Sequence, residues 1–191
     1  MALDPWTTTP ATDMKAAAGV VSFWRAAGPG RWFEKDPAFD AAFRARFLPL
    51  HMAVAWRRCD HWSETAEGAL ALIVLTDQFP RNAFRGTAHM YATDSLARFY
   101  ARHALVAGQD LEVEPDIRLF FYLPFAHSEE LADQALSVER ARLLGAEALE
   151  HARGHQAIVR RFGRFPHRNP LLGRETTEKE AAFLAEGGFA G

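Results

Sequence analysis

The stretch "GALALIVLTDQFPRN", Gly68–Asn82, decides the fold. Its apolar residues cover nearly all sides of a helix, so the stretch predicts a helix that is buried all round. Thr65 precedes it as an N-cap residue. Phe79-Pro80 predicts its end, because the residue before a proline avoids helical angles. We therefore expect a central helix that ends near residue 79, with other helices packed around it.

Helix start and stop signals recur on both sides of this stretch, and strand signals do not. Asp36-Pro37 places a capping carboxylate before a proline in the first turn, and Pro49 should kink or split the helix that follows. Gly163 suits a left-handed C-cap. The other expected helices cover about 12–27, 37–58, 87 or 93 to 108, 115–123, 129–144 behind a Ser128 cap, 146–162 and 177–184. Short connections favour antiparallel neighbours, so we predict an all-α fold of seven to nine helices in antiparallel pairs.

The composition is that of a soluble globular domain. The chain has 191 residues, 49% hydrophobic and 24% charged, with a formal net charge of −2. This length fits one domain, which we place at residues 12–191 behind an N-terminal arm at residues 1–11. A chain with so little net charge is unsuited to coating nucleic acid. Its single cysteine, Cys59, excludes an internal disulfide and a cysteine-based zinc site.

No segment predicts insertion into a membrane. The longest apolar runs, Ala69–Leu75 and Leu119–Ala126, are far shorter than the roughly 20 residues that span a bilayer. The first ten residues lack the basic and apolar regions of a signal peptide. We expect a cytoplasmic protein with no nucleic-acid or membrane partner, and the sequence carries no signal for an oligomeric state.

Five longer motifs stand out along the chain. They are "WFEKDPAFD", "GALALIVLTDQFPRNAFRGT", "ATDSLA", "FYLPFAHSEELADQ" and "RFGRFPHRNPLLGRETT". In this order they closely resemble an uncharacterised bacterial family, domain of unknown function 924, from about Val20 to Leu184. The resemblance implies a single compact domain with a tetratricopeptide-like, right-handed array of helices, and it implies no activity. Because nucleotide-binding, serine-hydrolase and zinc motifs are missing, the sequence implies no cofactor.

Polar residues gather where the central helix is expected to end. Asp77 and Gln78 stand on a very apolar helix, where an unpaired carboxylate faces a large desolvation cost. Arg81 and Asn82 follow directly. Two interpretations are open: these residues fasten the end of the helix, with Asp77 paired to a nearby arginine, or they line a ligand site.

Three histidines are candidates for chemistry. His127 precedes "SEE", whose serine and acidic residues suit a helix start and leave the histidine unexplained. His151 and His155 lie four residues apart on one helix face, but only His155 matches the family pattern. We expect no metal site, and His127, His155 and His167 are the only candidates for one.

Five arginines fall between Arg160 and Arg174, in a chain of net charge −2. They could stabilise a helix C-terminus and pair with carboxylates, or they could form a cationic pocket for carboxylate or phosphate. "RFPHRN" at 164–169 echoes "DQFPRN" at 77–82 with the opposite charge. We expect Asp77 and the 164–169 loop to face each other, either as an ion pair or across a ligand.

Three classes of function fit these patterns. The first is a helical scaffold that binds a small anion or a peptide carboxylate in a pocket lined by arginine and histidine. The second is a hydrolase-type or metal-dependent enzyme that uses the same pocket, and the third is a structural or interaction protein with a protein partner and no pocket chemistry. The candidate ligand-binding residues are Asp77, Gln78, Arg81, Asn82, His127, His155, Arg164, His167, Arg168 and Asn169. The candidate catalytic residues are His127, His167, Asp77 and Glu129.

Overall fold

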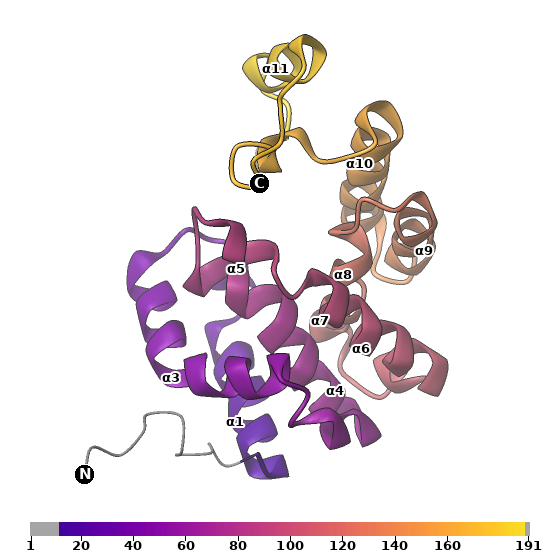
Figure 1. Cartoon of the computed structure of the whole chain (residues 1–191). Coiled ribbons are helices and arrows are strands. Elements are labelled where there is room, and N and C mark those ends of the chain that lie inside the picture. The colour runs from indigo at the N-terminus through magenta and orange to yellow at the C-terminus, as the bar shows by residue number, and fades with distance from the viewer. Residues whose placement is uncertain (1–11, 190–191) are drawn as a thin grey trace, which may run out of the picture. The chain divides into compact units, whose positions relative to one another are not determined.

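The computed structural model describes residues 12–189, and every regular element in that range is helical (Figure 1). The prediction of an all-α fold is therefore confirmed. The predicted arm at residues 1–11 lies outside the described residues. The described chain divides into an N-terminal unit (12–85 and 89–124) and a C-terminal unit (86–88 and 125–189), which we describe separately. Within 12–189, no helix is both long enough and apolar enough to cross a bilayer.

The N-terminal unit is built from seven helices and several shorter turns. They are α1 (Met14–Ala27), α2 (Pro29–Trp32), α3 (Pro37–Ala55), η1 (Asp60–Glu64), α4 (Ala66–Ile73), η2 (Val74–Gln78), α5 (Phe79–Ala83), α6 (Asp94–Ala107), η4 (Gln109–Leu111), α7 (Pro115–Arg118) and η5 (Leu119–Phe121). Two short elements, η3 (Ala88–Tyr91) and α8 (Leu123–Ala126), lie where the chain passes between the units.

The stretch from α4 to α5 forms the centre of this unit, as predicted. Every residue from Gly68 to Pro80 is buried. Helices α1 and α6 pack against α4, while α3 packs against η2 and α5. Gly68 is required by close approach, since a Cβ there would lie 2.1 Å from the carbonyl oxygen of Trp62.

The predicted helix end at Phe79-Pro80 is wrong. The chain stays helical to Ala83, because η2 is a π-helical turn in which the Phe79 N–H donates to the carbonyl of Val74, five residues back. In a continuous α-helix Pro80 would leave the carbonyl of Thr76 without a donor. Here Thr93 supplies that donor through its Oγ1, at 2.6 Å. A side chain from outside the helix thus replaces the backbone bond that proline cannot make.

Three other predicted boundaries also differ. Helix α3 continues through Pro49 without a break. Pro124, which directly follows the helix expected over 115–123, lies inside α8. Helix α9 (Leu131–Ala141) begins after Glu130 rather than Ser128. Ser128 Oγ instead donates to Asp133 at 2.8 Å, so its hydroxyl braces the turn before the helix.

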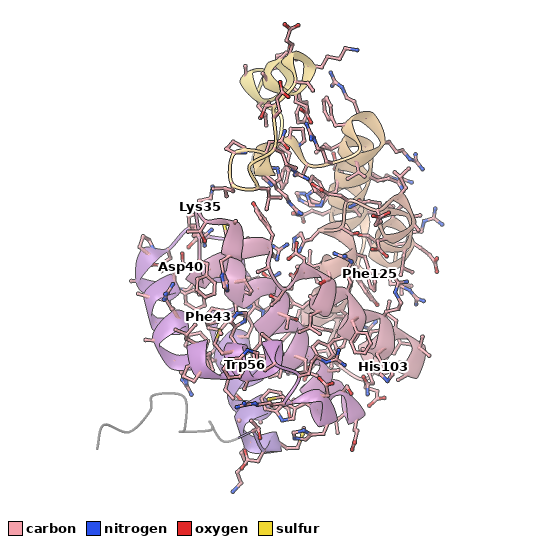
Figure 2. The ribbon with its side chains drawn as sticks, in the orientation of Figure 1. Lys35, Asp40, Phe43, Trp56, His103 and Phe125 are labelled. Carbon is pink, nitrogen blue, oxygen red and sulfur yellow. The ribbon has the colours of Figure 1, made fainter. Side chains whose placement is uncertain are left out.

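Aromatic rings fill the space between α1 and α3. Phe43, labelled in Figure 2, is fully buried and stacks on Phe23 and Trp24 at 5.3 and 5.4 Å between ring centroids. The four-residue spacing of Phe39, Phe43 and Phe47 places these side chains on one face of α3, and all three are buried. This apolar face holds α3 in the position from which its polar residues reach α5.

The C-terminal unit contains α9, α10 (Ala146–Phe162), η6 (Pro166–Arg168) and α11 (Glu178–Ala185). Helices α9 and α10 pack against each other, and α11 contacts the segment that holds η6. The predicted C-cap at Gly163 is confirmed, with a φ of 71°. The predicted capping box is also confirmed, since Thr177 and Glu180 each bond the backbone N–H of the other.

Candidate functional site

Three consecutive carbonyls of the buried π-helical turn η2 each accept a hydrogen bond from a side chain. Leu75 O lies 2.8 Å from Nδ1 of His51, which must be the protonated nitrogen because a carbonyl can only accept. Thr76 O accepts from Thr93, and Asp77 O accepts from Nη1 of Arg81 at 2.7 Å. Burial lowers the pKa of His51 and favours its neutral form. Such turns often occur at functional sites, and the candidates Asp77 and Gln78 lie within this one.

The carboxylate of Asp77 has partners inside the N-terminal unit. Gln78 Nε2 donates to it at 2.5 Å, and Arg81 Nη1 lies 3.2 Å from it. Arg81 also forms a two-pronged pair with Asp94, at 2.8 and 3.1 Å. Burial alone would lower the pKa of Arg81, but the two carboxylates raise it. One arginine thus bridges the two aspartates.

Asn82 and Arg85 converge on Asp40 of α3, which Figure 2 labels. Asn82 Nδ2 donates to Asp40 at 2.7 Å, and Arg85 donates at 2.8 and 3.2 Å. These contacts join the end of α5 to the start of α3. They support the interpretation in which the polar residues of "DQFPRN" fasten helices.

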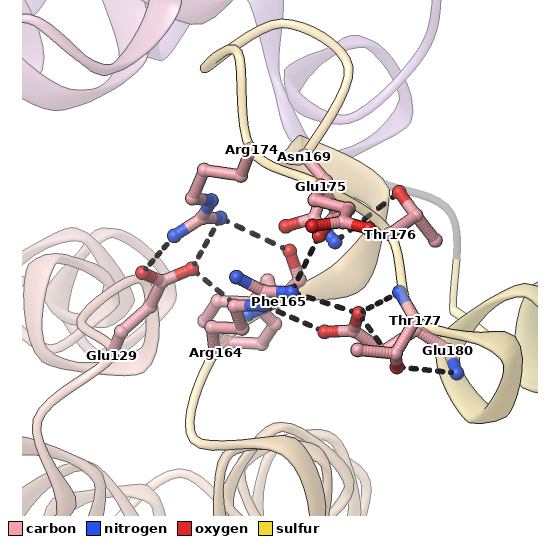
Figure 3. Close-up of polar contacts among 9 residues, drawn as sticks. All are labelled: Glu129, Arg164, Phe165, Asn169, Arg174, Glu175, Thr176, Thr177 and Glu180. Carbon is pink, nitrogen blue, oxygen red and sulfur yellow. Dashed lines mark hydrogen bonds and ion pairs between the residues drawn. The ribbon is translucent and has the colours of Figure 1, made fainter.

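Glu129 is the centre of a polar network in the C-terminal unit (Figure 3). It accepts the backbone N–H of Phe165 at 2.8 Å and two bonds from Arg174, at 2.7 and 3.0 Å. Burial would raise the pKa of Glu129, but Arg174 and the Phe165 N–H together lower it. A carboxylate held ionised in this way is a poor proton donor near neutral pH. Its evident role is to hold the Phe165 backbone in place.

A second carboxylate, Glu180, binds Arg164 at the start of the 164–169 loop (Figure 3). Arg164 donates to it at 2.6 and 2.9 Å, and also to the carbonyl of Glu175 at 2.7 Å. Arg164 and the capping contacts from Thr177 lower the pKa of Glu180 to about 2. Arg164 is thus engaged in a structural ion pair.

Most of the arginine density in 160–174 is explained by such contacts. Arg164 and Arg174 pair with glutamates, and Arg161 lies over the rings of Phe162 and Phe183 at 4.7 and 5.6 Å. Arg168 is 7% exposed, and its guanidinium lies 4.6 Å from the centroid of the Phe165 ring. Of the five arginines, Arg164 and Arg174 are therefore ion-paired, and Arg161 and Arg168 lie against aromatic rings.

His155 and His167 meet at this same ring. Their centroids lie 5.4 and 5.8 Å from that of Phe165. Both Nδ1 atoms are buried and have no hydrogen-bond partner among the described residues. Burial and the positive charges of Arg168 and His127 lower the pKa of His155 to about 3 and that of His167 to about 4. Both imidazoles are therefore neutral at physiological pH.

The remaining candidates are placed as follows. His127 lies close enough for its charge to lower the pKa of His155 and His167, whereas His151 is exposed. Asn169 is fully buried, with its Oδ1 unpartnered. Among residues 12–189, no group of three or more histidine, cysteine, aspartate or glutamate side chains is arranged to hold a metal ion.

The candidates fall into the two units rather than into one described site. Those of "DQFPRN" lie in the N-terminal unit, and those from His127 onward lie in the C-terminal unit. That the two groups face each other stays a prediction. Sequence analysis missed Thr93 and Asp94, whose partners are remote in sequence.

Comparison with known proteins agrees with the motifs. A family described as "Bacterial protein of unknown function (DUF924)" matches residues 20–188. A solved structure of the protein of unknown function ATU0120 from Agrobacterium tumefaciens is 55% identical, with a TM-score of 0.89. The similarity covers 92% of this chain and 100% of that one. The comparison with curated proteins gave no match. The resemblance inferred from the sequence is thus confirmed, and the chain belongs to the bacterial DUF924 family.

Proposed function

We propose that the C-terminal unit binds a small anion, such as the carboxylate of a metabolite or of a peptide, beside His155, His167 and Arg168. The observation that carries the proposal is the pair of imidazole Nδ1 atoms buried without a partner. Buried polar atoms nearly always have one. A neutral imidazole protonated at Nδ1 is a donor, so an anion that accepts from both rings would satisfy both atoms.

The local electrostatics supports an anion rather than a cation. Burial is the largest cause of the lowered pKa of both imidazoles; the charges of Arg168 and His127 lower both further, and that of Arg174 adds to the effect at His167. A positive potential that disfavours a proton favours a negative group at the same place. The negative charge of Glu129 offsets part of this positive potential at His167, but that carboxylate is already bound to Arg174.

The proposed site contains fewer residues than the site expected from the sequence. Arg164 is paired with Glu180, so we leave it out of the proposed site. In the N-terminal unit, Arg81 is already paired with Asp77 and Asp94. We therefore propose the anion site for the C-terminal unit alone. The tetratricopeptide-like arrangement and the cytoplasmic location stay predictions.

The test compares His155→Ala and His167→Ala with His151→Ala, an exposed control on the same helix as His155. Thermal stability of each protein is measured in acetate, phosphate, sulfate and chloride at constant ionic strength. A ligand that binds only the folded state raises its stability. We expect at least one of the first three anions to raise the Tm of the wild type and of His151→Ala, and to have no such effect on the other two variants.

An NMR measurement distinguishes binding of the anion from an effect of the substitutions on stability alone. In NMR titrations the bound anion should move the imidazole signals of His155 and His167 and raise the pKa of both. If no anion changes the wild-type Tm or these signals, the proposal is wrong, and a structural role for the histidines is what remains.

A further inference from the structure

Phe189 packs against the three rings that surround the proposed anion site. Its ring centroid lies 4.7 Å from that of His155, 5.1 Å from that of His167 and 6.4 Å from that of Phe165. We call His155, Phe165 and His167 the ring face. Phe189 remains 41% exposed although Phe165 beneath it is 1% exposed. It therefore covers the ring face from the solvent side.

The turn before Phe189 is built to direct the chain back to the ring face. The N–H of Gly188 donates to Phe183 O at 2.9 Å, and that of Gly187 donates to Leu184 O at 3.3 Å. This is the Schellman pattern that ends α11. Gly187 has a φ of 84°, and a Cβ on Gly188 would lie 2.5 Å from the ring and carbonyl of Phe183. Each glycine is thus required for a separate reason, one conformational and one steric.

We propose that Phe189 occupies the aromatic half of a ligand site, and that the ligand is an aromatic carboxylate whose ring takes the place of Phe189. The inference rests on the proposed anion site and extends it to a substrate class. The contacts of Phe189 demonstrate that the ring face accepts a phenyl group at edge-to-face and tilted angles, 82° to His167 and 58° to His155. These are the angles that aromatic pairs prefer.

The ring face and the proposed anion site share His155 and His167. The aromatic ring and the carboxylate of a ligand must therefore lie close together. His155 and His167 contact the phenyl ring and also carry the unpartnered Nδ1 atoms. Arg168 lies against Phe165, the third ring of the face. A ligand that fills both halves must therefore carry its carboxylate within a few bonds of its ring, as 3-phenylpropionate and a peptide ending in phenylalanine do.

Phe189 then competes with the ligand. An internal group that occupies a site lowers the apparent affinity by the fraction of molecules in which the site is open. Phe189→Ala should remove this competition and leave the imidazoles and Arg168 in place. Phe189 also lies just outside the residues matched by the family, 20–188, whereas the three residues of the ring face lie within them.

The experiment measures binding to the full-length wild type, to Phe189→Ala and to Leu172→Ala. Leu172 is a matched control, because it is 38% exposed in the same unit. The probes are 3-phenylpropionate, the dipeptide acetyl-Ala-Phe, the amide of each, and acetate. Affinity is taken from calorimetry and from the NMR signals of His155 and His167. Gly188→Ala serves as a second variant that displaces Phe189 through the backbone.

We expect Phe189→Ala to bind at least one aromatic carboxylate about tenfold more tightly than the wild type or Leu172→Ala. The corresponding amide should bind far more weakly, and Gly188→Ala should share part of the gain. A preference for acetyl-Ala-Phe would assign a peptide end, and a preference for 3-phenylpropionate a free metabolite.

Two results would overturn the inference in distinguishable ways. If acetate moves the histidine signals but neither aromatic acid binds better after Phe189→Ala, the anion site stands and the aromatic half is wrong. If no probe moves the signals in any variant, both proposals fail together.

Discussion

The bond from Thr93 to the carbonyl of Thr76 should be worth a measurable part of the stability of the N-terminal unit. Thr76 is fully buried and Thr93 is 9% exposed, so water cannot replace the donor easily. The backbone cannot replace it either, because residue 80 is proline. In Thr93→Val the side chain keeps its branched shape and loses only the hydroxyl. The carbonyl of Thr76 is then left buried without a partner.

The expected cost follows from that orphaned carbonyl. An unsatisfied buried acceptor costs about 1–3 kcal/mol, so we expect Thr93→Val to lower the free energy of unfolding by about 2 kcal/mol. With a slope of about 2 kcal/mol per molar urea for a protein of this size, the unfolding midpoint should fall by about 1 M.

A second substitution tests why Thr93→Val is destabilising, and not only by how much. Pro80→Ala restores a backbone N–H which, in α-helical register, points to the carbonyl of Thr76. In that background Thr93→Val should cost about 1 kcal/mol less, because the carbonyl has an alternative donor. The coupling is read from a double-mutant cycle, so the separate effect of losing the proline ring cancels.

Tryptophan fluorescence is the appropriate probe, since all five tryptophans lie in the first 62 residues and none lies in the C-terminal unit. Thr93→Ser, which keeps the hydroxyl and loses only the methyl group, is the control for the change of side chain. A cost for Thr93→Val that is equal in both backgrounds would refute the explanation of the π-helical turn given above.

Two further predictions concern the C-terminal unit. The pKa values of His155 and His167 are lowered from 6.5 to about 3 and about 4, so the unfolded chain binds protons that the folded unit does not. The stability from each histidine is present above pH 6.5 and is lost as the pH falls, by about 2 kcal/mol between pH 7 and pH 5. Amide hydrogen exchange in α10, corrected for intrinsic rates, should reveal the loss, and protection that does not change would contradict it. Separately, Glu129→Gln should cost about 2 kcal/mol, because it weakens the bonds from Arg174 and from a backbone N–H. Glu130→Gln, at an exposed neighbour, should cost almost nothing in the same exchange experiment, and equal effects of the two variants would count against a role for Glu129.

The sequence predicts the helices of this chain well where caps and apolar faces agree. Thr177 and Glu180 predicted the start of α11, and Gly163 predicted the end of α10, because both signals are local. The prediction failed at Phe79-Pro80 for a physical reason. The donor that allows the helix to continue is on Thr93, and a local pattern cannot reveal a partner seventeen residues away from the carbonyl of Thr76.

The candidate site was predictable to a similar degree. Its residue types and their clustering between Arg160 and Arg174 were visible in the sequence. Which arginines are paired was not, because Glu129 lies 45 residues from Arg174 along the chain. The number of arginines in this segment therefore suggested more positive charge than remains once Arg164 and Arg174 are paired with glutamates. The two unpartnered imidazole nitrogens, which carry the proposal, follow only from the packing of His155 and His167 around Phe165.

The π-helical turn η2 also holds one residue more than an α-helical turn, because its bond runs five residues back instead of four. Deleting a single residue within Val74–Gln78 would therefore convert the turn to α-helix and leave the directions of Arg81 and Asn82 nearly unchanged. Arg81 would still point to Asp94, and Asn82 to Asp40. A relative shorter by one residue here would thus lack the π-helical turn and still assemble these contacts. Within such a family, the length of this helix is as informative as the identity of its residues.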